Sequence, residues 1–442
     1  MRHQTASYPG KNGRTQHEAA NLKTSDTTPD LPVTLLTGGS DRPYVFGLTT
    51  SLLSKGAVLD LVGSDELDFA EFRSNPGLNF LKLRGDQRPD VSFLEKLSRV
   101  SAYYAKLIGY AATAKAKIFH ILWNNRFEVF DRTFLMLYYK LLRKKIVLTA
   151  HNVNADKRDG KDSSLNRATL RIQYRLCDHI FVHTEKMKRE LMAEFGVPDA
   201  HVTVIPFGIN NAVPNTSLTP CDAKQRLGLR EGERAILFFG RITPYKGLDY
   251  LIPAFRQLLS RGNDHRLIIA GRVDRCEKYW GAIRQNIQEE VRTGRIMLRD
   301  EFIPDDQTEV YFKAADVLVL PYRNIYQSGV LFLSHSFGLP VLAADVGSLT
   351  DDIVEGKTGF AFRPEDPVDL ARATEQYFAS NLYANLNTRR QEIRDYATER
   401  HSWDVVAQKT MCVYDNLLRK PLPGRSSNRD VANASLDEKT RS

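Results

Sequence analysis

Short apolar runs alternate with segments of helical periodicity along most of this sequence. In the first half, seven apolar runs predict β-strands, and the segments between them carry apolar residues at the spacing of one helix face. This alternation is typical of a parallel sheet that helices cover on both faces. The predicted strands are Val33–Leu36, Val58–Val62, Phe80–Leu83, Ile118–Leu122, Ile146–Thr149, Ile180–His183 and Val202–Ile205.

The second half repeats this alternation with six more predicted strands. Because each set of strands can form its own sheet, we expect an α/β fold of two doubly wound, Rossmann-like domains that face a central cleft. Asn, Pro, Ser and Thr cluster without periodicity over Asn210–Pro220, which indicates the boundary, and an amphipathic stretch at Trp403–Leu418 follows the last strand. The predicted strands are Ile236–Phe239, Leu267–Ala270, Ile296–Leu298, Val317–Leu320, Val341–Ala343 and Phe360–Phe362.

The length of 442 residues also favours two domains, because one core seldom serves so long a chain. We predict one domain over residues 31–210, a second over 211–400 and a final helix over 401–420 that crosses back to the first domain. Residues 1–30 and 421–442 lack apolar periodicity, and we expect disordered tails there. Ligands of doubly wound sheets bind beyond the carboxyl ends of the strands, so the chemistry is expected in the loops that follow them.

The composition argues against several classes of protein. Four cysteines lie far apart, with no Cys-x-x-Cys pair and no Cys/His cluster, which argues against a disulfide framework or a structural zinc and favours a reducing cytosol. No apolar run approaches the length of about 20 residues that a membrane-spanning helix needs. The polar N-terminus is not typical of a secretory signal. We therefore expect a cytoplasmic protein.

The charge of the chain favours an anionic partner. The 62 Lys and Arg residues exceed the 53 Asp and Glu residues, which gives a formal net charge of +9. Nucleic acid, an anionic membrane surface and a polyanionic small substrate all fit this charge, but no zinc finger or RNP-type strand is present, so we do not expect nucleic acid. Basic and aromatic residues gather over Lys96–Lys106 and Arg132–Lys145. This pattern fits either a peripheral contact with anionic headgroups or buried helices with a solvated basic edge.

The strongest chemical signal is the segment Phe239–Gly247, which follows a predicted strand and precedes a helical pattern over Leu248–Leu259. Gly240 lets the chain turn tightly out of the strand, and Arg241 and Lys246 bring two cations to the edge of the sheet. A diphosphate leaving group gains negative charge as its bond to a sugar breaks, so fixed cations stabilise the transition state more than the ground state. The alternative is a solvated loop with incidental charges.

A second anion-binding signal follows the predicted strand Val317–Leu320. Ser328 and Gly329 leave backbone N–H groups uncovered at the start of a predicted helix, and such a helix start can bind an anion. Gly338 and Pro340 then end the helix and lead into the next strand. An ordinary helix N-cap is the alternative.

In the first half, three further features stand at or near the ends of predicted strands. Thr37-Gly38-Gly39-Ser40 follows the first strand, and adjacent glycines permit a ligand to approach closely, although the Gly-x-Gly-x-x-Gly dinucleotide pattern is missing. His151 ends an apolar strand, so its imidazole is expected to project into the cleft, and a structural histidine is the alternative. His183 ends the next strand and is a further candidate, whereas His120 lies within a strand and is expected in the core.

These segments resemble the family 4 glycosyltransferases, which have a two-lobed "B" fold. The resemblance covers residues 31–420, and its motifs are specific in combination. It implies a nucleotide-diphosphate sugar bound mainly by the C-terminal domain, an acceptor bound mainly by the N-terminal domain, and no metal or other cofactor. The matching residues are Gly240, Arg241, Lys246 and Gly247, the run Ile269-Ala270-Gly271, and the segments Ala314–Pro321 and Phe337–Val341.

The resemblance also implies roles for individual residues. His151 would line the reaction centre, where it hydrogen-bonds the donor sugar or orients the acceptor hydroxyl, while Arg241 and Lys246 would stabilise the departing diphosphate. The glycine-rich loop after the first strand would lie near the donor phosphate and the acceptor. The candidate residues are His151, Arg241 and Lys246 for catalysis, Gly240, Gly271, Gln327, Ser328, Gly329 and Val330 for the donor, and Gly38, Gly39, Asp41 and Arg42 for the acceptor or phosphate loop.

The sequence departs from this family at one point. The family carries two glutamates separated by seven residues before the Gly-x-Pro turn, and the corresponding positions here are Ile325 and Leu333. The sequence therefore leaves open which residues bind the hydroxyls of the donor sugar and ribose. It also leaves open whether the anomeric configuration is retained or inverted. The nearby acids Asp345, Asp351 and Asp352 are candidate substitutes.

From these features we expect transfer of a hexose from a nucleotide-diphosphate sugar to a glycan or polyprenyl-linked glycan acceptor in polysaccharide biosynthesis. The family implies retention of the anomeric configuration. Two alternatives stay open. One is a sugar-nucleotide epimerase of the same architecture, which needs acid–base carboxylates in the cleft. The other is a catalytically silent nucleotide-sugar-binding protein, which the missing glutamates favour.

Overall fold

The first half of the chain forms a parallel sheet of seven strands in the order β3-β2-β1-β4-β5-β6-β7. The computed structural model describes residues 32–38, 41–86, 92–158, 162–210, 213–230, 232–262 and 264–419, so the tails predicted at 1–30 and 421–442, and Gly39, lie outside the described residues. The strands are β1 (Val33–Leu36), β2 (Leu59–Ser64), β3 (Leu78–Gly85), β4 (Ile118–Ile121), β5 (Lys145–Thr149), β6 (His179–Val182) and β7 (Val202–Val204).

The second half forms a separate parallel sheet in the order β10-β9-β8-β11-β12-β13. Both strand orders reverse direction at the first strand of the sheet, which is the topology of a doubly wound, Rossmann-like domain. The expected fold class is therefore confirmed. The strands are β8 (Arg234–Phe239), β9 (His265–Ala270), β10 (Ile296–Arg299), β11 (Val317–Leu320), β12 (Val341–Ala344) and β13 (Gly359–Phe362).

Every predicted strand is present, because central strands of such sheets are buried on both faces and read as continuous apolar runs. All four residues of β6 and of β11 are buried, for example. The predicted ends were less accurate at β3, which extends beyond the predicted Phe80–Leu83 on both sides. This strand lies at the edge of its sheet and has no fully buried residue, so its polar positions hid its ends from the apolar pattern.

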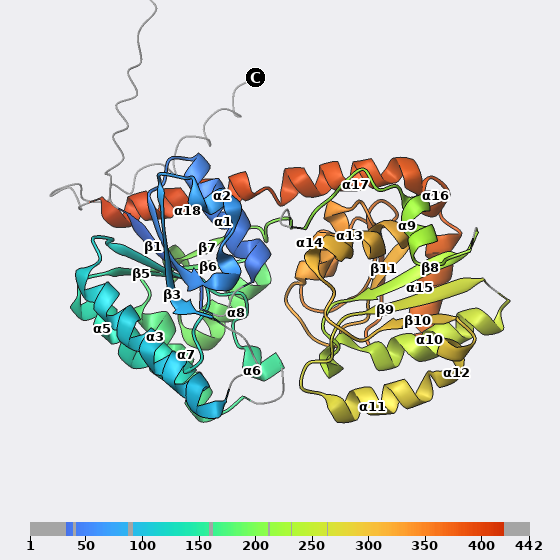
Figure 1. Cartoon of the computed structure of the whole chain (residues 1–442), viewed down its shortest axis with the longest axis horizontal. Helices are drawn as coiled ribbons and strands as arrows, with labels where there is room; N and C mark the ends of the chain where they lie inside the picture. Colours follow the sequence, from blue (N-terminus) through green and yellow to red (C-terminus); the bar gives the residue numbers. More distant parts are fainter. Residues whose placement is uncertain are drawn as a thin grey trace, which may run out of the picture. The chain divides into compact units, whose positions relative to one another are not determined.

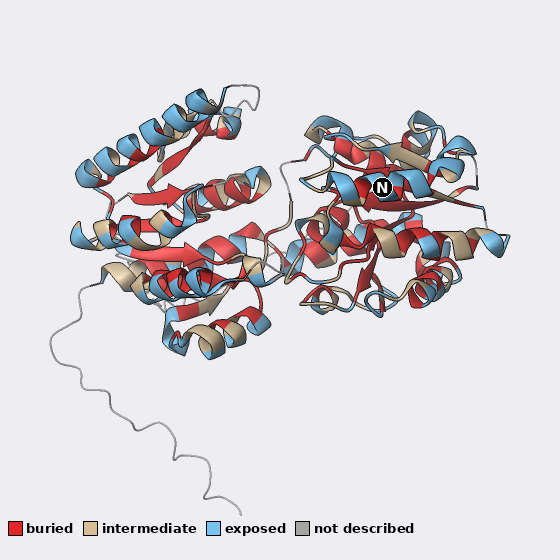
Figure 2. Ribbon diagram, turned by 90° about the horizontal axis from the view of Figure 1, so that it is seen from below, coloured by how far each residue is buried: buried red, intermediate tan, exposed pale blue. Residues whose placement is uncertain are grey.

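Helices cover both faces of the first sheet, as Figures 1 and 2 show. Apolar side chains of α3, α5, α7 and α8 form a core with one face, and those of α1 and the final helix α18 form a core with the other. These helices are α1 (Arg42–Ser54), α2 (Ala70–Arg73), α3 (Phe93–Thr113), α4 (Glu128–Phe130), α5 (Met136–Leu141), α6 (Ala155–Arg158), α7 (Ser164–Leu176), α8 (Glu185–Phe195) and α18 (Trp403–Leu418).

The second sheet is covered in the same way. Side chains of α10, α11 and α15 pack on one face, and those of α9, α13 and α14 pack on the other. The helices of this half are α9 (Pro220–Arg226), α10 (Leu248–Ser260), α11 (Glu277–Asn286), α12 (Gln288–Arg292), α13 (Asp305–Ala314), α14 (Gly329–Ser336), α15 (Pro367–Phe378), α16 (Asn381–Ala384) and α17 (Leu386–Arg400).

The C-terminal helix α18 completes the core of the first sheet. Trp403 Nε1 donates a hydrogen bond to Ile209 O at 2.7 Å, which fixes the start of the helix. Near its end, the Tyr414 hydroxyl lies 2.6 Å from Nδ1 of His120, which is fully buried in β4 as expected. The last described segment of the chain thus belongs to the core that its first described strand also joins.

Candidate functional site

Two loops at the carboxyl end of the second sheet touch each other through glycines. Gly240 follows β8 and Gly271 follows β9, and a Cβ atom at Gly271 would lie 2.0 Å from the Gly240 carbonyl oxygen. A side chain at Gly271 is therefore excluded by backbone atoms, which do not move aside as a flexible side chain would. The contact fixes the turn that leads from β8 into Arg241.

The same turn is held against the loop that follows β11. Gly247 has φ 67°, and a Cβ atom there would lie 1.8 Å from the Pro321 carbonyl oxygen. Lys246 ends the short 3₁₀ turn Pro244–Lys246 that leads into α10. This turn thus places the Lys246 side chain between the loop that follows β8 and the loop that follows β11.

Lys246 is a buried cation in this position. Its side chain is almost fully buried, and Nζ lies 5.3 Å from the centroid of the Tyr322 ring. Burial and the nearby Arg241 guanidinium lower the pKa of Lys246 to about 7. Arg241 itself is largely exposed and forms an ion pair with Asp274 at 3.1 Å. The structure therefore brings the two predicted cations close enough to interact.

The start of α14 faces the Gly240 turn. A Cβ atom at Gly240 would lie 2.9 Å from Lys246 Nζ and 3.4 Å from Val330 Cγ2, so these residues meet at one point. Ser328 is the N-cap of α14, and its side chain makes no capping hydrogen bond but lies 3.3 Å from the Tyr322 hydroxyl. Leu331 N donates to Ser328 O at 3.0 Å. The N–H groups of Gly329 and Val330 precede it, and the first N–H groups of a helix have no partner within it, so these two can bind an anion beside Lys246.

Gln327 lies in a different environment from Ser328 and Gly329, which follow it. Its Nε2 donates a hydrogen bond to Asp352 Oδ2 at 3.2 Å, and its Oε1 is buried with no partner among the described residues. Burial raises the pKa of Asp352 to about 7. Of the three candidate acids, Asp352 contacts this loop, whereas Asp345 accepts a hydrogen bond from Thr350.

The two positions where the family carries glutamate are apolar core positions here. Ile325 and Leu333 are both buried and belong to the hydrophobic cluster of α13 and α14. A carboxylate in either place would be buried among apolar side chains, which is costly without a partner. Apolar side chains packed in the core thus occupy the two positions where the family carries carboxylates.

His151 lies at the carboxyl end of the first sheet, after β5. Its ring stacks on Trp123, with centroids 4.0 Å apart and planes 5° apart, and the ring of Tyr44 meets it edge-on. Burial lowers the pKa of His151 well below its ordinary value, and His183 acts in the same direction. The imidazole is therefore neutral at physiological pH.

His183 fixes the tautomer of His151. Burial lowers the pKa of His183 to about 4, so its ring is also neutral. Its Nδ1 lies 3.3 Å from Ile205 O, which can only accept, so Nδ1 carries the proton and Nε2 carries a lone pair. Since His183 Nε2 lies 3.0 Å from His151 Nδ1, His151 donates to it through Nδ1. The other ring nitrogen of His151, Nε2, is buried without a hydrogen-bond partner among the described residues, and the Leu122 backbone raises the pKa of the ring against the effect of burial.

The loop after β1 is placed beside this histidine. A Cβ atom at Gly38 would lie 2.0 Å from the Trp123 carbonyl oxygen, so the loop touches the residue on which His151 stacks. Asp41 caps α1 by accepting a hydrogen bond from Tyr44 N at 3.1 Å. Loss of hydration within the surrounding protein raises the pKa of Asp41. The hydrogen bond from the Tyr44 amide and, to a smaller extent, the positive charge of Arg241 lower it.

Arg42 is directed elsewhere. It pairs with Asp305 at 3.3 Å and lies over the Phe69 ring at 5.1 Å. Trp123, Tyr44 and Tyr322 were not predicted as site residues, because nothing in the local sequence pattern marks an aromatic residue as a neighbour of a distant histidine or lysine.

Most cations of the segment 132–145 are bound within the protein. Lys140 and Lys145 pair with Asp178, Lys144 donates to the Ala114 and Ala116 carbonyls, and Arg132 pairs with Glu128. Phe134 and Leu141 of the same segment are 66% and 82% exposed. No helix in the described part of the chain is long and apolar enough to cross a membrane.

Comparison with known proteins identifies the family. The family "Glycosyl transferases group 1" matches residues 233–380, and "Glycosyltransferase Family 4" matches residues 49–213. An uncharacterized glycosyltransferase of Methanocaldococcus jannaschii is 26% identical over 380 residues, covering 83% of this chain and 92% of its own.

Solved structures share the fold. Sucrose-phosphate synthase from Thermosynechococcus elongatus superposes with a TM-score of 0.70 at 19% identity, over 88% of this chain and 99% of its own. The Anabaena protein HepE in complex with UDP-glucose does so with a TM-score of 0.66 at 15% identity, over 86% of this chain and 99% of its own. Since the two family matches together span both sheets, the chain belongs to the family 4 (group 1) glycosyltransferases and has their two-lobed B fold.

Proposed function

We propose that this protein transfers a hexose from a nucleotide-diphosphate sugar to a hydroxyl group of a glycan or lipid-linked glycan during synthesis of a polysaccharide. The observation that carries the proposal is the meeting of Lys246, the Gly240 turn and the N-terminus of α14 at one point. Lys246 and Arg241 would stabilise the negative charge that grows on the departing diphosphate, and the free amides of α14 would add hydrogen bonds.

The first sheet would supply the acceptor side of the reaction. His151 would hydrogen-bond a hydroxyl of the donor sugar or of the acceptor through Nε2, which has no partner among the described residues and which the substrate must reach in its buried position. Gly38 and Asp41 lie in the loop beside it. The family resemblance favours retention of configuration, which proton NMR of the first-formed product would test.

Thermal unfolding in the presence of nucleotides is the first experiment. A ligand that binds only the folded state raises the melting temperature, so UDP, GDP and ADP and their sugar derivatives can be compared directly. UDP is the first choice because the HepE structure contains UDP-glucose. If the stabilising sugar nucleotide is isomerised without an acceptor, the protein is an epimerase instead. If it binds but no glycan or lipid acceptor is ever modified, the protein is a silent binding protein.

Lys246→Ala should lower turnover by roughly 10²–10³-fold, because a preorganised charge at a developing anion contributes about this much. The measurement is kcat for the donor found above, with circular dichroism to show that the variant is folded. Lys278→Ala, at an exposed lysine on α11, is the matched control and should leave kcat unchanged. Normal turnover of folded Lys246→Ala would contradict the role proposed for this residue.

A further inference from the structure

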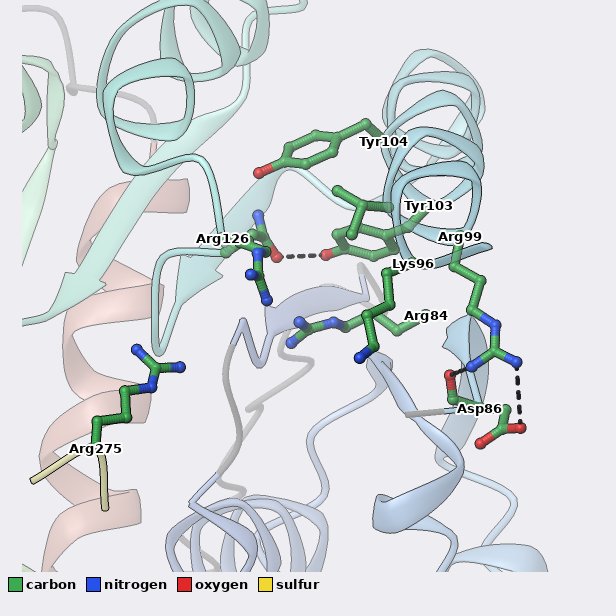
Figure 3. Close-up of a pocket in the computed structure, with 10 residues that line it drawn as sticks. Arg84, Asp86, Lys96, Arg99, Tyr103, Tyr104, Arg126 and Arg275 are labelled. Carbon is green, nitrogen blue, oxygen red and sulfur yellow. Dashed lines mark hydrogen bonds and ion pairs between the residues drawn. The ribbon is translucent and has the colours of Figure 1, made fainter. Parts of the chain in front are cut away.

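A basic cavity of about 390 Å³ lies beside helix α3 (Figure 3). It is bounded by the end of β3, the first turns of α3 and the loop after β4, and Arg275 of the loop after β9 also lines it. Its size is in the range of small-molecule sites. The charged residues that line it are Arg84, Asp86, Lys96, Arg99, Arg126 and Arg275.

Two carboxylates near this cavity, those of Asp86 and Glu95, both pair with Arg99. Arg99 Nη2 lies 3.8 Å from Asp86 Oδ2 and also pairs with Glu95. Lys96 and Arg126, by contrast, are exposed and have no ion-pair partner among the residues that the structure describes. The cavity therefore carries excess positive charge, which raises the local concentration of anions.

The wall that carries these cations is held by partly buried hydrogen bonds. Tyr103 Oη donates to Asn125 Oδ1 at 2.6 Å, and Asn125 Nδ2 donates to Asp131 Oδ1 at 3.2 Å. The Arg84 guanidinium lies 5.4 Å from the centroid of the Tyr103 ring, and Figure 3 shows it near Lys96 and Arg126. Because Asn125 precedes Arg126, the network fixes the loop position from which the Arg126 side chain extends.

The same loop connects the cavity to His151. Trp123 stacks on His151 and stands at the start of the loop, while Asn125 and Arg126 line the cavity at its other end. An anion held by Arg126 would thus be bound by the loop that also carries Trp123, the stacking partner of His151. Arg275, which follows the Asp274 that pairs with Arg241, lines the same cavity.

We propose that this cavity binds the phosphate group of a phosphorylated acceptor, with Lys96, Arg126 and Arg84 as its cations. The proposal rests on the transferase function proposed above and names its acceptor class. Arginine binds phosphate through two parallel hydrogen bonds and lysine acts as a point charge, so this set suits a phosphate ester. The ester belongs to a water-soluble sugar phosphate or to a prenyl phosphate, and the experiment below separates these sources.

The test is calorimetric titration of the full chain, with UDP present to occupy the diphosphate site. Glucose 6-phosphate and farnesyl phosphate are compared with their neutral counterparts, glucose and farnesol. We expect at least one phosphate ester to bind ten times more tightly or better than its neutral counterpart. Preference for one ester then identifies the soluble or the lipid source.

The double variant Lys96→Gln/Arg126→Gln should lose at least tenfold in affinity for that ester. Lys106→Gln, which removes an exposed cation from the same helix outside the cavity, should bind it normally. Failure of both esters to bind, or equal binding by the double variant and the wild type, would overturn the proposal. The increase in melting temperature that UDP causes reports on the donor site alone. If UDP does not raise the melting temperature of the wild type, that result counts against the proposed function and not against the acceptor site.

Discussion

Lys246 carries its charge under unusual conditions for a lysine. Because burial and Arg241 lower its pKa to about 7, it is protonated below neutral pH and progressively neutral above it in the free protein. A bound diphosphate favours the protonated form and raises this pKa. Above about pH 7 the protein must therefore take up a proton on binding, and affinity falls with pH.

The expected result is an increase in the Kd for UDP of up to about tenfold for each pH unit above about pH 7.5. Fluorescence or calorimetric titration between pH 7.5 and 9 measures this slope, in a range where the terminal phosphate is already ionised. Lys246→Arg is the control, because arginine stays protonated at these pH values and should give a flat profile. A flat profile for the wild type would show that Lys246 is not the cation that meets the diphosphate.

At the scale of elements, the strands were predictable because a strand buried on both faces consists of consecutive apolar residues. The contact partners of the site residues were not predictable from such runs. The contact of Gly247 with Pro321 joins loops that follow β8 and β11, and the stacking of Trp123 on His151 joins loops that follow β4 and β5. Such pairs depend on strand order, which local periodicity does not contain.

The basic cavity shows the same limit. The sequence marked Lys96–Lys106 as basic and aromatic, but it gave no signal that Arg84 and Arg126 would join Lys96. Arg84 stands at the end of β3 and Arg126 in the loop after β4, which are strands separated in the sheet by β2 and β1. The helix α3, which leads from one strand to the other, brings its first turns to both.

The loop contacts predict a difference between two glycines that flank α10. Gly247 and Gly262 have φ 67° and 78°, so alanine at either costs about 1–2 kcal/mol for the left-handed conformation. Only at Gly247 would the new Cβ also meet a backbone oxygen, whereas nothing lies within 4 Å at Gly262. We expect Gly247→Ala to lower the free energy of unfolding in urea by at least about 1 kcal/mol more than Gly262→Ala, which is the lower end for overpacking. Equal losses would mean that the Pro321 loop moves aside freely.

At the scale of the whole molecule, α18 packs against the candidate reaction centre in the first sheet. The Trp403 indole lies between Gly47 and Gly208, where added Cβ atoms would fall 2.1 Å and 2.2 Å from it. Its ring centroid is 5.0 Å from that of Tyr44, which in turn lies 4.7 Å from that of His151. Packing at Trp403 thus supports the aromatic cluster that positions His151.

Removing the indole should therefore affect the acceptor side more than the donor side. Trp403→Ala should lower the free energy of unfolding by about 3–5 kcal/mol, the cost of a large cavity, and should lower kcat. Its Kd for UDP should change less than kcat, because this aromatic cluster reaches α14 only indirectly, through Phe207, whose ring lies 5.5 Å from that of Tyr44 and stacks on Phe332. Val405→Ala, at a position 36% exposed on the same helix, is the control and should change little. If Trp403→Ala weakened UDP binding as strongly as it lowered kcat, the donor site would depend on α18, and Lys246, Gly240 and α14 would not suffice to form it.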